Sequence, residues 1–185
     1  YERLKDYDGV TVYRRRATPN PGRGDTERPW LDLVKQYGAG SLYGLPEARM
    51  RMGGFHADAG NWEGAVREYR LVTEMIPAHS VAHYSLAQVS LRSGRVAEAE
   101  AAFGRALDLV ADRSDDYRAT VRLHIARLYL GAGLHHRAIR ELTLALDLNP
   151  GLADARFDLG ACHLLLGDWD AAKAAIAEAV RRRGR

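Results

Sequence analysis

The chain has 185 residues, of which 46% are hydrophobic and 28% charged, proportions typical of a globular domain. No apolar run approaches the roughly 18 residues of a membrane-spanning helix, so we expect a soluble chain. The formal net charge of +3 is too small to indicate nucleic-acid binding by itself, and the single Cys162 excludes an intrachain disulfide. We assign no compartment, because a start at Tyr1 rather than Met fits both a cytoplasmic chain and one processed for export.

Residues 1–45 are predicted to form an irregular N-terminal arm. The first half of the arm has no helical period, although Val10–Tyr13 fits a short strand. A capping residue at Asp25 or Thr26 and an apolar face behind it predict one short helix over about 27–37. Two interpretations stay open: a loosely draped, disordered arm, or an arm that orders against a partner or along the rest of the chain.

A repeating unit fills the remainder of the chain. Gly133 and Gly167 are 34 positions apart, and so are Ala138 and Ala172. Small and large residues recur in phase in four successive units, a pattern typical of a solenoid built from one supersecondary unit. The four predicted units are 46–79, 80–113, 119–152 and 153–185.

These units resemble tetratricopeptide repeats. The third unit has small Ala126, turn-forming Gly133, Ala138, large Leu142 and closing Pro150 at the places where the family has such residues. Small residues let two helices cross closely, and the glycine supplies a left-handed turn between them. The resemblance implies an all-α fold: a solenoid of helical hairpins wound as a right-handed superhelix, behind the irregular N-terminal arm.

One break in the period separates the second and third units. Gly94 and Gly133 are 39 positions apart, so five extra residues lie within 111–117. Ser114 is predicted to cap a lengthened helix, with Asp115 and Asp116 stabilising its positive end. The extra segment is either a longer turn between repeats or an acidic loop that contacts a partner.

No catalytic residue, cofactor or metal site is predicted. His79 and His83 are four residues apart, but no carboxylate or cysteine nearby completes a metal-binding set. Cys162-His163 lacks the first cysteine of a haem-attachment motif, because position 159 is Leu159. The glycines lie between helices rather than in a phosphate-binding loop, and no serine lies in a nucleophile elbow. We therefore expect that the chain is not an enzyme.

The resemblance also implies a binding surface, because in this family the first helix of each unit lines a concave groove. The residues that it places there are Tyr84, Gln88, Leu91, Arg92, Leu123, Arg127, Leu130, Phe157 and Leu164. As a partner-binding groove, the apolar members would anchor a helix or an extended segment and the arginines would bind an acidic group. Alternatively, several of these side chains pack between neighbouring units.

The predicted function is a non-catalytic protein–protein interaction scaffold or an assembly subunit of a larger complex. Its partner would be another protein, either a peptide segment or a subunit, bound in the groove and by the arm. The alternative is RNA or an anionic surface bound through Arg14–Arg16 and Arg181–Arg183, although such terminal charge runs are commonly solvated tails. Binding of chaperone C-terminal carboxylates is disfavoured, because Tyr84, Gln88 and His124 stand where such sites need Lys or Asn.

The last unit lacks the polar capping helix with which solenoids usually finish. Its second helix, predicted from Asp168, is mostly alanine on its outer side and runs into the Arg181–Arg183 cluster. This end is either tolerated bare or covered by a partner or by residues absent from this sequence.

Overall fold

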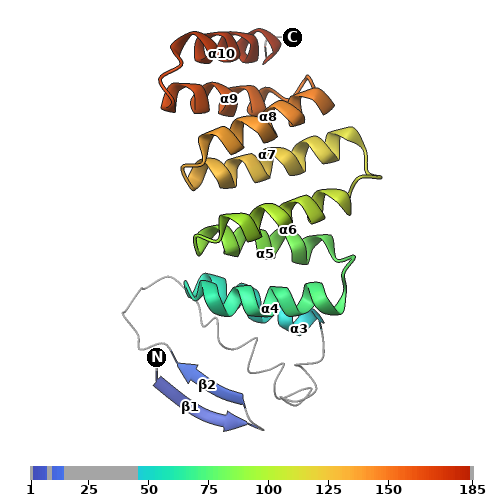
Figure 1. Ribbon diagram of the computed structural model, residues 1–185, viewed down its shortest axis with the longest axis vertical. Helices are drawn as coiled ribbons and strands as arrows, with labels where there is room; N and C mark the ends of the chain where they lie inside the picture. Colours follow the sequence, from blue (N-terminus) through green and yellow to red (C-terminus); the bar gives the residue numbers. More distant parts are fainter. Residues whose placement is uncertain (1, 8–9, 15–45, 184–185) are drawn as a thin grey trace.

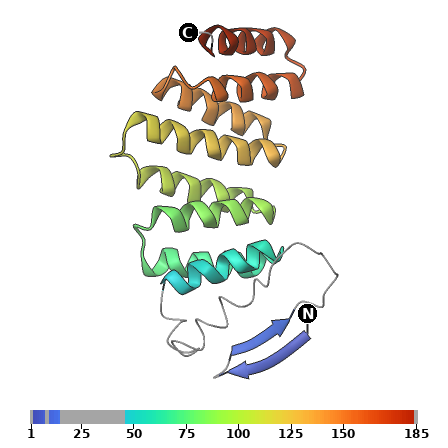
Figure 2. The ribbon, with the colours of Figure 1, turned by 180° about the vertical axis from the view of Figure 1, so that it is seen from behind.

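A computed structural model of the chain describes residues 2–7, 10–14 and 46–183. Within these ranges it contains eight helices, arranged as four hairpins stacked one on another, with α3 and α10 at opposite ends of the stack (Figures 1 and 2). The helices are α3 (Pro46–Asp58), α4 (Trp62–Met75), α5 (Ser80–Arg92), α6 (Val96–Asp108), α7 (Asp115–Gly131), α8 (His135–Leu148), α9 (Ala153–Leu165) and α10 (Trp169–Arg183).

Side-chain caps begin several of these helices. The Asn61 side chain accepts a hydrogen bond from the Gly64 amide at 3.0 Å, and the Ser114 hydroxyl accepts one from the Tyr117 amide at 3.3 Å. The predicted cap at Ser114 is thus confirmed. The helix that it starts, α7, has 17 residues, whereas α5 and α9 have 13 each.

Glycine reverses the chain within each hairpin, as predicted. Gly60 and Gly133 have φ of 74°, and Gly94 and Gly167 have φ of 79°. A side chain strains this left-handed backbone, which is why glycine recurs there.

The two helices of a hairpin cross closely because their contact positions are small. A Cβ atom on Gly53 would lie 2.5 Å from the Tyr69 ring, and one on Gly160 would lie 2.6 Å from Ile176. The alanines facing these crossings are 0–1% exposed in all four units: Ala65, Ala99, Ala138 and Ala172. These small positions let one core run through the stack.

The junction between the second and third hairpins differs from the other two. Helix α4 packs closely along α5, and α8 along α9, whereas α6 and α7 touch much less. An aromatic contact crosses this junction, because Phe103 meets Tyr129 edge to face at 5.5 Å between centroids; within the second hairpin Phe103 also meets Tyr84 at 5.8 Å. An ion pair between Arg137 and Glu100 also spans this junction.

The N-terminal part contains a two-stranded antiparallel sheet of β1 (Glu2–Tyr7) and β2 (Val10–Arg14). The strand predicted at Val10–Tyr13 is confirmed, and its pairing with Glu2–Tyr7 is an addition that the sequence pattern did not indicate. The helix predicted over 27–37 lies outside the described residues.

Candidate functional site

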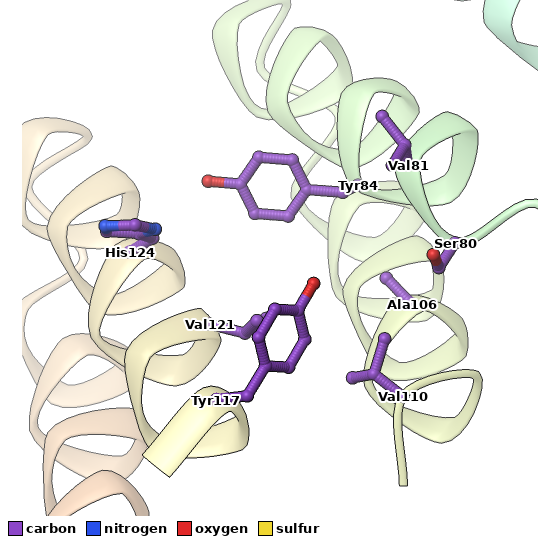
Figure 3. A pocket seen from close by; sticks show the side chains of 8 residues that line it. All are labelled: Ser80, Val81, Tyr84, Ala106, Val110, Tyr117, Val121 and His124. Atoms are coloured by element: carbon purple, nitrogen blue, oxygen red, sulfur yellow. The ribbon is translucent and has the colours of Figure 1, made fainter. Parts of the chain in front are cut away.

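A cavity of about 200 Å³ opens where the repeat period lengthens, between α5, the end of α6 and α7 (Figure 3). Four aliphatic side chains form most of its wall, and the other lining residues bring hydroxyl or imidazole groups. The lining residues are Ser80, Val81, Tyr84, Ala106, Val110, Tyr117, Val121 and His124. Such a hollow, mostly apolar with a few polar groups, is the usual form of a site for a ligand or a partner side chain.

The extra turn of α7 creates this cavity. Because the helix starts at Asp115, it places Tyr117 opposite the beginning of α5, with Val121 one turn further along. Helices α6 and α7 touch little, and the cavity lies beside the end of α6, next to this loose junction. Tyr117 is 50% exposed and Val81 is 57% exposed, so apolar surface at the rim is accessible to a partner.

Polar groups reach the cavity from both sides. The Tyr84 ring extends from α5 towards α7, where His124 lies, and the Tyr117 hydroxyl points into the space between the helices (Figure 3). Burial raises the pKa of the Tyr84 phenol above its ordinary value of 10.0. The phenol is protonated at neutral pH in any case, and its hydroxyl can donate a hydrogen bond. The cavity can therefore hold an apolar side chain while hydrogen-bonding the backbone beside it.

The structure separates the residues predicted for the groove. Tyr84 lines the cavity, and Gln88 lies one turn further along α5, half-buried. Leu130 and Phe157 are also half-buried, and Leu164 is 40% exposed.

Leu91 and Leu123, by contrast, are core residues. They are 8% and 4% exposed and belong to the main hydrophobic cluster. They fit the alternative interpretation, packing between units, and we leave them out of the proposed contact surface.

The two arginines predicted in the groove are already engaged within the chain. Arg127 on α7 donates from Nε to Asp158 at 2.6 Å and from Nη2 to Asp154 at 3.2 Å, both on α9. The hydrogen bond to Asp158 is the main cause that raises the pKa of this guanidinium. Arg92 lies over the Trp62 ring, 5.6 Å from its centroid. Because both arginines already have partners within the chain, this geometry disfavours the predicted binding of an acidic group by Arg92 and Arg127.

Buried ion pairs within two hairpins are a feature that the sequence analysis missed. Glu68 and Glu141 are 9% and 3% exposed, and they accept hydrogen bonds from Arg49 at 2.9 Å and Arg122 at 2.6 Å. Both pairs join residues 19 positions apart, at the same places in the first and third units. The recurrence of an arginine and a glutamate at this spacing in two units could have revealed the pairs from the sequence. It indicates that the pairs have a structural role.

The histidines suspected of metal binding have structural contacts. His79 caps α5 by accepting from the Ala82 amide at 3.1 Å, and His83 Nε2 lies 3.0 Å from the Pro77 carbonyl oxygen. Within the described ranges, no three His, Cys, Asp or Glu side chains come together as a metal site. None of the described helices is long and apolar enough to cross a membrane.

Of the two terminal arginine clusters, Arg15 and Arg16 lie outside the described residues, whereas Arg181–Arg183 form the end of α10. Arg14 belongs to β2, and Arg181 on α10 pairs with Glu178 at 2.7 Å. Binding of RNA or an anionic surface through these clusters stays an alternative hypothesis.

Comparison with known proteins decides the family. The tetratricopeptide repeat family matches residues 56–122 and 129–184, most of the solenoid. The chain belongs to the tetratricopeptide repeat family. Members of this family are generally non-catalytic scaffolds, and the family and fold of this chain support a role in protein–protein interaction. No curated protein sequence matches it.

Solved structures agree with this fold. MamA from Desulfovibrio magneticus RS-1 has a TM-score of 0.58 at 20% identity, over 86% of this chain and 96% of that one. BtubC from P. vanneervenii has a TM-score of 0.61 at 20% identity, over 83% and 76%. PilF from Pseudomonas aeruginosa has a TM-score of 0.53 at 22% identity, over 74% and 60%. At these identities the likeness concerns the fold alone.

Proposed function

We propose that this chain is an assembly scaffold that binds a segment of a partner protein across α5, α7 and α9. One apolar side chain of the segment enters the cavity beside Tyr84 and Tyr117. The observation that carries the proposal is this cavity, because it lies on first helices of the repeats and combines an apolar wall with exposed donors. A buried anchor side chain within a rim of weaker contacts is how most interfaces gain their affinity.

The charge beside the cavity limits the chemistry of the segment. On the α7–α9 side, two carboxylates, Asp154 and Asp158, face the single guanidinium of Arg127. An acidic partner group would be repelled there unless it broke these ion pairs. We therefore propose a segment that is neutral or basic where it crosses α9, with its apolar anchor over α5 and α7.

The arm, residues 1–45, is proposed as a second contact. Its support is the β1–β2 hairpin: a two-stranded sheet has an open edge on each strand, and such an edge can pair with a strand of another chain. An isolated hairpin is marginally stable, so a partner would also stabilise it.

Site-specific photocrosslinking in cells of the native source tests the proposal. A photoreactive amino acid replaces exposed His124 at the cavity, and exposed Arg140 on α8 as the control position. Mass spectrometry should identify one protein that crosslinks to position 124 and does not crosslink to position 140. The crosslinked residues of that protein should fall within one segment. Crosslinks at position 140 alone, or the same proteins at both positions, would contradict the proposal.

A further inference from the structure

We propose that the cavity between α5 and α7 selects one kind of anchor, an aromatic ring with a polar atom at its edge, as in tyrosine and tryptophan. The inference rests on the proposed function, because it names the partner side chain that enters this site. It deepens that function by specifying which segments of a partner protein can bind.

A row of edge-to-face rings runs from the core to the wall of the cavity. Tyr129 on α7 meets Phe103 on α6 at an interplanar angle of 72°, and Phe103 meets Tyr84 on α5 at 63°. Tyr129 and Phe103 are buried, whereas Tyr84 is half-buried and lines the cavity. The row therefore ends in an aromatic wall against which one more ring can pack.

Tyr117 supplies a second ring from the opposite helix. Figure 3 shows the Tyr84 ring reaching in from α5 and the Tyr117 ring from α7, both beside the same space. An aromatic side chain that enters this space can set its edge or its face against both rings. Such ring pairs are more favourable than burial of the same area against aliphatic groups, so an aliphatic anchor would bind less tightly.

The size of the cavity suits a single ring. Its volume is about 200 Å³, and an apolar protein cavity of roughly 150 Å³ is large enough to bind benzene. The inner part of the wall is aliphatic, with Val110 and Ala106 only 7% and 3% exposed. The cavity can therefore bury most of one aromatic side chain.

The polar groups of the cavity disfavour a charged anchor and favour a ring with a polar edge. No carboxylate, lysine or arginine is among the lining residues, so an ionised side chain buried there would lack a partner of opposite charge. The hydroxyls of Tyr84 and Tyr117 and the imidazole of His124 lie around the space (Figure 3). An anchor that displaces water from them must replace its hydrogen bonds, and a phenol hydroxyl or an indole N–H can do so whereas a leucine side chain cannot.

Methyl NMR spectra of the full chain test this preference without the native partner. The methyl groups of Val81, Val110 and Val121 line the cavity, and those of buried Val72 on α4 report on the fold elsewhere. The probes are N-acetyl-tyrosinamide and, as the aliphatic match, N-acetyl-leucinamide. We expect saturable shifts of the three cavity valines with the tyrosine probe, and a dissociation constant about threefold to tenfold higher for the leucine probe.

Substitutions in the two aromatic walls make the test specific to the rings. Tyr84→Leu and Tyr117→Leu each remove one ring and keep an apolar wall, so each should lower the preference for the tyrosine probe at least about twofold. Tyr117 is half-exposed, so Tyr117→Leu should keep the fold even if Tyr84→Leu disturbs the packing on Phe103, and unchanged Val72 signals would show this. The proposal would be overturned by equal dissociation constants for the two probes, by cavity valines that do not shift, or by a preference that both variants retain.

The result can be told apart from that of the photocrosslinking experiment. A crosslinked partner segment that contains neither tyrosine nor tryptophan would overturn the aromatic anchor and leave the scaffold proposal standing. A cavity that prefers the tyrosine probe in a chain that crosslinks no protein at position 124 would support the aromatic preference and contradict the proposed function.

Discussion

Phe103 on α6 and Tyr129 on α7 meet edge to face, with ring centroids 5.5 Å apart. Each ring is 2% exposed. Together they continue the hydrophobic core from the second hairpin to the third, where α6 and α7 touch little. The widened junction can therefore hold a cavity at its surface while the solenoid stays continuous beneath it.

Phe103→Ala should weaken the solenoid at this junction. Removing a buried phenylalanine costs about 3 kcal/mol, and the stability of a solenoid depends on the interfaces between its units. We expect urea unfolding followed by circular dichroism to change from one transition to two. Leu144→Ala, at a position 37% exposed, is the control and should cost about 1 kcal/mol or less. A single transition with unchanged midpoint in Phe103→Ala would show that the aromatic contact does not couple the hairpins.

Tyr129 should make the fold sensitive to alkali. Burial, with Glu100 and Glu141 nearby, raises the pKa of its phenol from 10.0 to about 12. The unfolded phenol loses its proton near pH 10 and the folded one near pH 12, so its contribution is complete below pH 10 and disappears as the pH rises to 12. Between pH 9 and pH 12 the free energy of unfolding should fall by roughly 2 kcal/mol more in the wild type than in Tyr129→Phe. Parallel curves for the two proteins would count against this assignment.

Glu141→Ala should destabilise the third hairpin. Its carboxylate is buried and accepts from Arg122 at 2.6 Å and Arg140 at 3.1 Å, so its removal leaves Arg122 without its buried partner. The expected loss is about 2 kcal/mol in the free energy of unfolding, measured by urea titration. Glu74→Ala, at an exposed position near the end of α4, should change it by less than about 0.5 kcal/mol. Equal effects of the two substitutions would contradict the structural role of the buried pair.

Two glycines of the second hairpin should respond in opposite directions. Gly94→Ala places a side chain at φ of 79° and should cost about 1 kcal/mol. Gly104 lies inside α6, and a Cβ there meets nothing within 4 Å, so Gly104→Ala should stabilise by about 0.5–1 kcal/mol. Thermal melts of both variants measure the difference, and shifts of the same sign would contradict the assigned turn.

The fold was largely predictable because its constraints are local and repeated. Left-handed turns need glycine, close crossings need small residues and Ser114 caps a helix, and each requirement is visible in the sequence. Which of the predicted groove residues are buried was harder to predict. Leu91 and Leu164 occupy the same place in their units, 11 residues after Ser80 and Ala153, yet Leu91 is in the core and Leu164 is 40% exposed, because exposure depends on the neighbouring hairpin.

Ion pairs between residues of different hairpins were also not predicted from the sequence. Arg127 looked free in the sequence, since its carboxylate partners, Asp154 and Asp158, belong to the next unit. The cavity was signalled only indirectly, by the 39-residue spacing between Gly94 and Gly133. A change in period predicts a lengthened element, and coordinates are needed to show which side chains then surround the space.

The affinity of the crosslinked partner for a cavity variant tests the central claim most directly. Calorimetric titration would compare the wild-type chain with Tyr117→Ala, whose side chain is half-exposed and whose loss the fold should tolerate, and with Leu144→Ala as the surface control. A contact at the centre of the interface predicts a dissociation constant about tenfold higher for Tyr117→Ala and unchanged for Leu144→Ala. A dissociation constant unchanged in Tyr117→Ala, with the partner still bound, would contradict the claim that the cavity between α5 and α7 anchors the partner.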